Sequence, residues 1–163
     1  MVVMGVTGSG KTTVGEALAE AIGAIFVDGD RLHPEANIAK MSAGIPLDDD
    51  DRWPWLAKVG ETLRRQPAPV IVGCSALKRA YRDFIIERAG APVLFIYLDG
   101  SRELISTRMH ERTGHFMPTS LLDSQFATLE APGKDEDAIA VSIDAPLDLI
   151  VADIRTKFEE RAP

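Results

Sequence analysis

Residues 5–12 read Gly5-Val6-Thr7-Gly8-Ser9-Gly10-Lys11-Thr12, and this stretch decides the fold. It satisfies the pattern G-x-x-x-x-G-K-[ST]. A short apolar run precedes it at residues 1–4, and an amphipathic helical pattern follows it. Strand, glycine-rich turn and helix form the context of a phosphate-binding loop, because glycines let backbone N–H groups converge on phosphate oxygens at a helix N-terminus. The stretch therefore predicts a site for the phosphates of a nucleotide.

The loop also carries side chains suited to phosphoryl transfer. Lys11 is expected to contact the β- and γ-phosphates of ATP as a catalytic residue, and Thr12 is expected to ligate Mg²⁺. Two alternatives stay open from the loop alone: a turn that merely joins strand to helix, and a nucleotide-binding module that regulates a partner without chemistry. The residues expected to bind the nucleotide here are Gly5, Val6, Thr7, Gly8, Ser9, Gly10, Lys11, Thr12 and Thr13.

Short β-branched apolar runs alternate with helical patterns along the rest of the chain. The runs are continuously apolar, as in parallel strands that helices cover on both faces. Without repeats or linkers, the pattern predicts a single domain over residues 1–163 with an α/β fold of three layers, the P-loop NTPase fold. Ligands of such sheets bind beyond the carboxyl ends of the strands. Strands are expected at residues 1–4, 24–27, 69–74, 93–98 and 139–143, and further helices at 34–41, 53–65, 78–89, 101–112, 119–129 and 146–160.

Composition narrows the choice of partners and compartment. The net charge of −7 repels polyanions, which argues against nucleic acid and anionic membranes as partners. No apolar run approaches the roughly 20 residues that cross a bilayer, and no charged leader precedes the first strand. Cys74 is the only cysteine, which suits a reducing compartment, so the cytoplasm is expected. Cys74 itself is expected to be a buried residue at a strand end.

Two carboxylates follow the second expected strand, in Asp28-Gly29-Asp30. Phosphoryl transfer to an alcohol needs a carboxylate near the attacking hydroxyl and often another near hydrated Mg²⁺. Asp30 is expected to take the first role, and Asp28 the second, through a water molecule. The alternative is that either residue caps the next helix.

The stretch from Asp28 to Leu56, DGDRLHPEANIAKMSAGIPLDDDDRWPWL, resembles the gluconokinase family. The resemblance continues through CSALKRAYR at residues 74–82, GHF at 114–116, SQFATL at 124–129 and EAPG at 130–133. It implies a fold similar to shikimate and adenylate kinases, with a five-stranded parallel sheet in the order 2-3-1-4-5 and a lid at about residues 108–126. The implied reaction phosphorylates D-gluconate to 6-phospho-D-gluconate at the expense of ATP, and a homodimer is implied as well.

A sugar acid needs cations and hydrogen-bond donors at its site, and the chain supplies them. The expected substrate-binding residues of this group are His33, Lys40, Arg52, Lys78 and Arg79, together with Asp30. His33 could instead be an ordinary helix-start residue, and the two lysines and Arg79 could lie on solvated helix faces. The acidic run Asp48–Asp51 is interpreted as a turn and helix cap, and Trp53 and Trp55 as packing anchors.

The segment expected to form the lid adds further candidates. Arg108 and Arg112 are four residues apart and share a helical face, so Arg108 is expected near the nucleotide and Arg112 at the phosphates as a catalytic cation. Arg112 could also act only as a favourable cation at a helix C-terminus. His115 and Gln125 are expected to bind gluconate, and Asp144 and Pro146 to border the adenine.

Three functions remain in competition. The first is a gluconate kinase, and the second is a kinase of the same fold that acts on shikimate, a nucleoside monophosphate or another aldonic acid. The third is a nonenzymatic module that binds nucleotide. The long match over residues 28–56 favours the first.

Overall fold

A five-stranded parallel sheet forms the centre of the structure, which is a computed structural model. The structure describes residues 1–113 and 119–161, apart from the side chains of residues 112, 113 and 119. The strand order is β2-β3-β1-β4-β5, as predicted. The register aligns Val3 of β1 and Asp28 of β2 with the same residue, Gly73 of β3. The strands are β1 (Val2–Met4), β2 (Ile25–Asp28), β3 (Val70–Gly73), β4 (Phe95–Asp99) and β5 (Ala138–Ser142).

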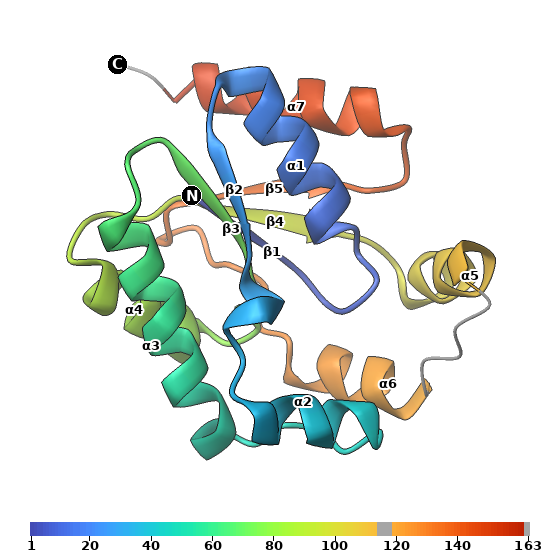
Figure 1. Cartoon of the computed structure of the whole chain (residues 1–163). Helices are drawn as coiled ribbons and strands as arrows, with labels where there is room; N and C mark the ends of the chain where they lie inside the picture. The colour runs from blue at the N-terminus through green and yellow to red at the C-terminus, as the bar shows by residue number, and fades with distance from the viewer. Residues whose placement is uncertain (114–118, 162–163) are drawn as a thin grey trace.

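Helices cover both faces of the sheet, which confirms the three-layer prediction (Figure 1). Helices α1 (Lys11–Ile22) and α7 (Leu147–Glu159) pack on one face, and α3 (Asp49–Arg65) and α4 (Arg79–Ala89) pack on the other. A 3-10 turn, η1 (Gly29–Leu32), follows β2. Helices α2 (Glu35–Ser42), α5 (Arg102–Thr113) and α6 (Thr119–Thr128) lie toward the carboxyl ends of the strands. In the described part of the chain, no helix combines the length and apolarity of a membrane span.

The core explains why the strand sequences are continuously apolar. All three residues of β1 are fully buried, and β3 is buried along its whole length. A central strand with helices on both faces has no solvated side on which polar residues could alternate. Cys74 is fully buried directly after β3, as predicted, and burial raises the pKa of its thiol to about 12.

Helix α3 begins at Asp49, four residues before the predicted start at Trp53. The prediction was wrong because the acidic run supplies a complete helix N-terminus. The Asp48 carboxylate accepts from the backbone N–H of Asp51, and the Asp51 carboxylate accepts from the N–H of Asp48, which is a capping box. The interpretation of this run as a helix cap is thereby confirmed. Pro54 then lies inside the helix rather than at its first position.

Arg82 fixes the turn between β3 and α4, which forms one wall of the site described below. Its side chain is 1% exposed, and its guanidinium donates to both carboxylate oxygens of Glu136, at 2.6 and 3.0 Å. The same group donates to the carbonyls of Ala76 and Leu77 in the turn, at 2.9 and 3.3 Å. Ala76 has φ +45°, a conformation that is costly for alanine, so these bonds hold a strained turn in place.

We predict that Arg82→Met lowers the free energy of unfolding by about 3–5 kcal/mol, because it removes the cation that pairs with the Glu136 carboxylate and the donor to two turn carbonyls. Urea denaturation followed by circular dichroism measures the change. Lys157→Met is the matched control, because Lys157 and its partner Asp153 are both more than 40% exposed. The control should lose no more than about 1 kcal/mol. Equal losses in the two variants would contradict the role assigned to Arg82.

Candidate active site

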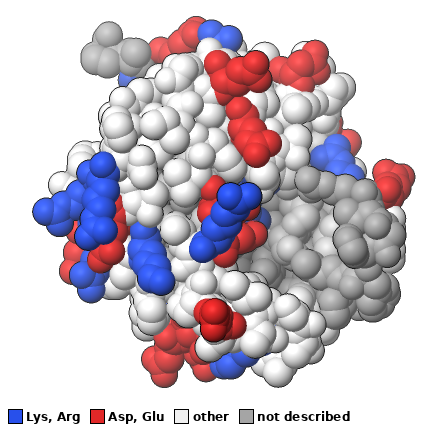
Figure 2. All heavy atoms as spheres, in the orientation of Figure 1, with Lys and Arg blue, Asp and Glu red and all other residues white. Residues whose placement is uncertain are grey.

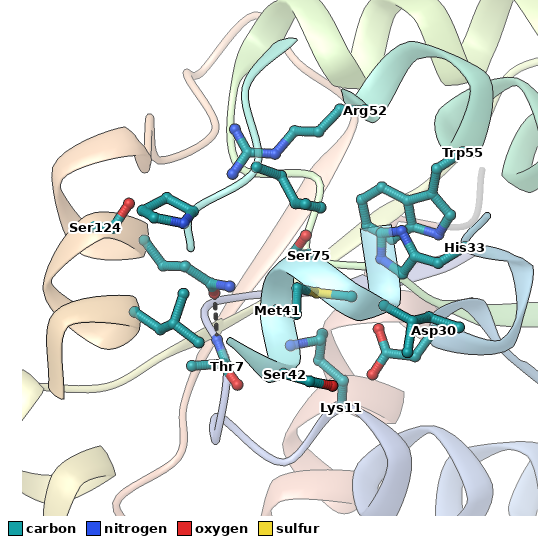
Figure 3. A pocket seen from close by; sticks show the side chains of 15 residues that line it. Thr7, Lys11, Asp30, His33, Met41, Ser42, Arg52, Trp55, Ser75 and Ser124 are labelled. Atoms are coloured by element: carbon teal, nitrogen blue, oxygen red, sulfur yellow. Dashed lines mark hydrogen bonds between the residues drawn. The ribbon is translucent and has the colours of Figure 1, made fainter. Parts of the chain in front are cut away.

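A cavity of about 320 Å³ opens beyond the carboxyl ends of β1, β2 and β3 (Figure 3). Its walls come from the glycine-rich loop, η1, α2, the start of α3, the turn after β3 and α6. Six predicted site residues line it: Thr7, Lys11, Asp30, His33, Arg52 and Gln125. The cavity therefore collects residues that are up to 118 positions apart in the sequence, Thr7 and Gln125.

The loop has the geometry that phosphate binding requires. Gly8 and Gly10 have φ +76° and +95°, which L-residues rarely adopt. The Lys11 ammonium curls back to donate to the carbonyls of Gly5 and Val6, at 3.1 and 3.0 Å. The Ser9 hydroxyl is buried and is the one buried side-chain polar atom without a partner in the described part of the chain. This loop offers an ammonium, backbone amides at a helix N-terminus and an unsatisfied hydroxyl, a donor set that suits an anionic ligand.

Lys11 and Asp30 face the same cavity from different elements (Figure 3). Desolvation lowers the pKa of the Lys11 ammonium, and the Asp30 carboxylate is the largest influence that opposes this. Desolvation raises the pKa of Asp30, Lys11 lowers it, and the neighbouring Asp28 raises it. The two charges therefore support one another in a site where either alone would be less favourable. A carboxylate placed opposite the phosphate-binding lysine can accept a proton from a hydroxyl that attacks a bound phosphate.

Asp28 caps the turn that carries Asp30. One oxygen of the Asp28 carboxylate accepts from the backbone N–H of Asp30 at 3.0 Å. The capping alternative considered for Asp28 is thus observed. The cap orients Asp30, and the second oxygen of Asp28 lies outside this hydrogen bond.

Arg52 enters the cavity from the first turns of α3 and is held by α4. Its side chain is buried, and Nη1 donates to the Tyr81 hydroxyl at 2.7 Å. That hydroxyl donates in turn to the Asp49 carboxylate in a short hydrogen bond. Desolvation and the bond to Asp49 raise the pKa of Tyr81, so the phenol stays protonated. The guanidinium of Arg52 is thereby held in the wall of the cavity. None of the ion pairs found among the described residues involves it.

His33 and Trp55 form a stacked pair that also lines the cavity (Figure 3). Their ring centroids are 3.9 Å apart with an interplanar angle of 19°. The Trp55 indole N–H donates to the carbonyl of Gly29 at 2.8 Å, which fixes the pair against η1. Burial and the nearby Arg52 lower the pKa of His33 to about 4, so its imidazole is neutral at pH 7. Trp53, by contrast, packs edge-on against Tyr81 and Phe84, as a packing anchor should.

Three of the predicted substrate-binding cations lie outside the cavity and pair with acidic residues. Lys40 binds Asp51 at 2.7 Å, Lys78 binds Asp49 at 3.5 Å, and Arg79 binds Asp135 at 2.8 Å. Figure 2 shows that basic side chains lie beside acidic ones at several places on the displayed face. The alternative of solvated helix-face residues therefore describes these three in the structure.

A second cavity, of about 370 Å³, lies on the other side of the glycine-rich loop. Gly8, Gly10 and Thr13 line it together with Arg108 of α5 and Ala145, which stands between Asp144 and Pro146. Pro146 is the N-cap of α7. A ligand whose phosphates lie on the loop can extend its other end into this second cavity. The side chains of Arg112 and His115, both predicted site residues, lie outside the described residues.

Several lining residues escaped the sequence analysis. Asn37, Ser75, Tyr81 and Ser124 contribute to the cavity or to its support. All four lie in the stretches that resemble the gluconokinase family, but no role was assigned to them. For Asn37 a further signal was its spacing from His33, four residues away and therefore a neighbour along a helix start.

The chain is similar in sequence to a known protein family and to several gluconokinases. A sequence family described as an AAA domain matches residues 1–132. The chain is 46% identical to the gluconokinase of Gluconobacter oxydans, over 98% of this chain and 90% of that protein. It is 47% identical to the thermoresistant gluconokinase of Escherichia coli, over 93% of this chain and 88% of that protein.

Solved structures agree with these relatives. The crystal structure of a gluconokinase from Sinorhizobium meliloti superposes with a TM-score of 0.87 at 50% identity, covering 99% of this chain and 96% of that one. Shikimate kinase from Aquifex aeolicus superposes with a TM-score of 0.59 at 16% identity, over 98% and 95% of the two chains. The second likeness concerns the fold alone.

We predict that Gly8→Ala weakens ATP binding at least about tenfold. Alanine at φ +76° costs about 1–2 kcal/mol, and its Cβ would lie 2.6 Å from the Met109 side chain, so that side chain or the loop must shift. Isothermal titration calorimetry with a nonhydrolysable ATP analogue measures the affinity.

Gly23→Ala provides the control for this substitution. Gly23 has a similar φ of +70°, but its Cβ would meet nothing within 4 Å, and it lies at the far end of α1. This variant should lose stability but retain the affinity of the native protein. If Gly8→Ala also retained the native affinity for the ATP analogue, the loop would not be the phosphate site.

Proposed function

This chain belongs to the gluconokinase family, and we propose that its site transfers the γ-phosphoryl group of ATP to the 6-hydroxyl of D-gluconate with Asp30 as the proton acceptor. The products are ADP and 6-phospho-D-gluconate. The observation that carries this assignment is the placement of Lys11 and Asp30 in one cavity, beside the loop that suits phosphates. As the bond from the 6-oxygen to phosphorus forms, the bond from phosphorus to the β–γ bridging oxygen breaks, and the hydroxyl proton passes to Asp30.

The nucleotide is assigned to the loop and the second cavity. Residues 5–13 bind the phosphates, with Lys11 at the β- and γ-phosphates, and Arg108, Asp144 and Pro146 lie toward the adenosine. Magnesium fits this donor set. Thr12 at the start of α1 would hold it directly and Asp28 through water, while the remaining ligands are phosphate oxygens and water. Bound there, the ion would neutralise charge on the phosphates.

Gluconate is assigned to the cavity of about 320 Å³. Arg52 is its buried cation and can grip a carboxylate bidentately. With the carboxylate at Arg52 and the 6-hydroxyl at Asp30, the intervening hydroxyls face His33 and Gln125. Lys40, Lys78 and Arg79 remain candidate substrate-binding residues, and the ion pairs that they form with Asp51, Asp49 and Asp135 support structural roles as the alternative.

The remaining assignments rest on resemblance to the family. We propose that residues 1–163 act as one domain, that a lid at about residues 108–126 closes over ATP, and that Arg112 and His115 complete the site. We also propose a homodimer that works in the cytoplasm. The net charge of −7 argues against nucleic acid or an anionic membrane as a partner.

A panel of acceptors tests the function. We predict that the purified protein releases ADP from MgATP when D-gluconate is added, and that other aldonates, shikimate and AMP give much lower values of kcat/KM. A coupled assay for ADP gives the rates. A preference for shikimate or AMP would favour another kinase of this fold, and ATP binding without acceptor-dependent release would favour a nonenzymatic module.

We predict that Asp30→Asn lowers kcat by about 10²–10⁴ while ATP affinity stays near normal, because the amide cannot accept the hydroxyl proton. Single-turnover kinetics and calorimetry separate the two effects. Asp50→Asn is the control, since Asp50 is exposed on α3 and lines neither cavity. Near-normal turnover by Asp30→Asn would remove its role as proton acceptor.

A further inference from the structure

Asn37 is a buried polar residue that the reaction as described does not use. It is 3% exposed and lies in α2, one turn after His33. Its side-chain nitrogen Nδ2 is 2.9 Å from the backbone carbonyl of Asp51 and 3.1 Å from Nδ1 of His33. A buried amide with both neighbours at hydrogen-bond distance is positioned by its surroundings.

The carbonyl of Asp51 settles which way the amide points. A carbonyl oxygen can only accept, so the group that faces it must be the NH₂ of Asn37 and not its oxygen. The two hydrogens of that NH₂ then serve the two neighbours. One goes to Asp51, and the other goes to Nδ1 of His33, which must present a lone pair.

The consequence for His33 is a defined tautomer. When Nδ1 accepts, the single proton of a neutral imidazole resides on Nε2. His33 lines the cavity, and Nε2 is not among the buried polar atoms that lack a partner in the described structure. The free donor of the ring is therefore accessible from the cavity.

The surroundings of the ring also disfavour a charged imidazolium. Arg52 of α3 is the charged group that most influences the ring, and it opposes protonation together with burial. Asp51 of α3 directs its carboxylate to Lys40, and Lys11 and Asp30 are the other charged groups of the cavity wall. On the remaining face the ring is covered by the uncharged Trp55.

We propose that Asn37 is a positioning residue that holds His33 as the neutral Nε2–H tautomer, so that His33 donates a hydrogen bond to a hydroxyl of the sugar acid. This inference rests on the proposed function. It divides recognition between two side chains of the cavity: Arg52 binds the carboxylate through charge, and His33 recognises a neutral hydroxyl through one donor. A neutral donor adds selectivity without drawing a second carboxylate or a phosphate into the acceptor site.

Nuclear magnetic resonance tests the tautomer without any turnover. Long-range ¹H–¹⁵N correlation spectra of the uniformly ¹⁵N-labelled protein distinguish Nε2–H, Nδ1–H and doubly protonated rings. The chain has three histidines, and His33→Gln identifies the signals of His33 by their loss. We expect the neutral Nε2–H pattern throughout pH 6–8. An Nδ1–H pattern or an imidazolium in this range would overturn the proposal even if gluconate is phosphorylated.

Asn37→Asp tests the consequence for the substrate. A carboxylate beside Nδ1 can only accept, so it draws the ring proton to Nδ1 and removes the Nε2 donor from the neutral ring. We expect KM for gluconate to rise about tenfold at pH 8, the equivalent of one lost hydrogen bond, with KM for ATP changed less than twofold. The carboxylate also raises the pKa of His33. Acidification toward pH 6 should therefore restore Nε2–H and lower KM again, whereas KM of the native protein should stay flat.

Further controls separate positioning from a general structural effect. The Gln side chain of His33→Gln does not titrate, so this substitution combined with Asn37→Asp should show no acid rescue. His33→Leu should lose at least tenfold. A KM in Asn37→Asp that is raised equally at all pH values would indicate only structural damage and would overturn the proposal. Absence of gluconate-dependent ADP release by the native protein would instead overturn the proposed function, and the tautomer spectra would still be readable.

Discussion

The placement of Lys11 and Asp30 in the wall of one cavity is the constraint on which the rest of the site depends. Lys11 follows β1 and Asp30 follows β2, and these strands are not adjacent, because β3 lies between them. Val3 and Asp28 both align with Gly73 of β3, so the carboxyl ends of β1 and β2 lie at nearly the same level of the sheet. The sheet order thus sets both the distance between donor and acceptor sides and their common depth. Desolvation in the cavity disfavours the charged form of Lys11 and of Asp30, and each of the two charges favours the charged form of the other.

The walls of the acceptor cavity are supported by helix packing rather than by the sheet. Arg52 is oriented by Tyr81, so its position depends on how α3 packs against α4. His33 is held by Trp55 on one side and by Asn37 on the other, which ties α2 to α3. The strained turn after β3 is held by the buried guanidinium of Arg82. The hydrogen bonds from Arg52 to Tyr81 and from Asn37 to Asp51 join residues 29 and 14 positions apart, and they help to keep a defined set of donors in one cavity.

Much of the fold was predictable because its signals are local. Continuous apolar runs marked the strands, and the glycine-rich motif placed the first turn, while the strand order followed from the family resemblance. The start of α3 was missed because the capping box formed by Asp48 and Asp51 depends on side-chain geometry and not on hydrophobic period. At the site, Lys11 was identifiable from the glycine-rich motif, and Asp30 from its place just after a strand. The ion pairs of Lys40 and Arg79 could not be predicted, because their partners, Asp51 and Asp135, are 11 and 56 residues away and residue type alone does not identify a paired cation.

A crystal structure of the protein with a nonhydrolysable ATP analogue, Mg²⁺ and D-gluconate tests the central claim most directly. The account predicts that the γ-phosphate lies on the residue 5–12 loop and that the gluconate carboxylate lies on Arg52. The 6-hydroxyl should then be within roughly 2.6–3.2 Å of the Asp30 carboxylate, on the side facing the γ-phosphorus. Gluconate bound elsewhere, or bound in this cavity with its 6-hydroxyl remote from Asp30, would contradict the account.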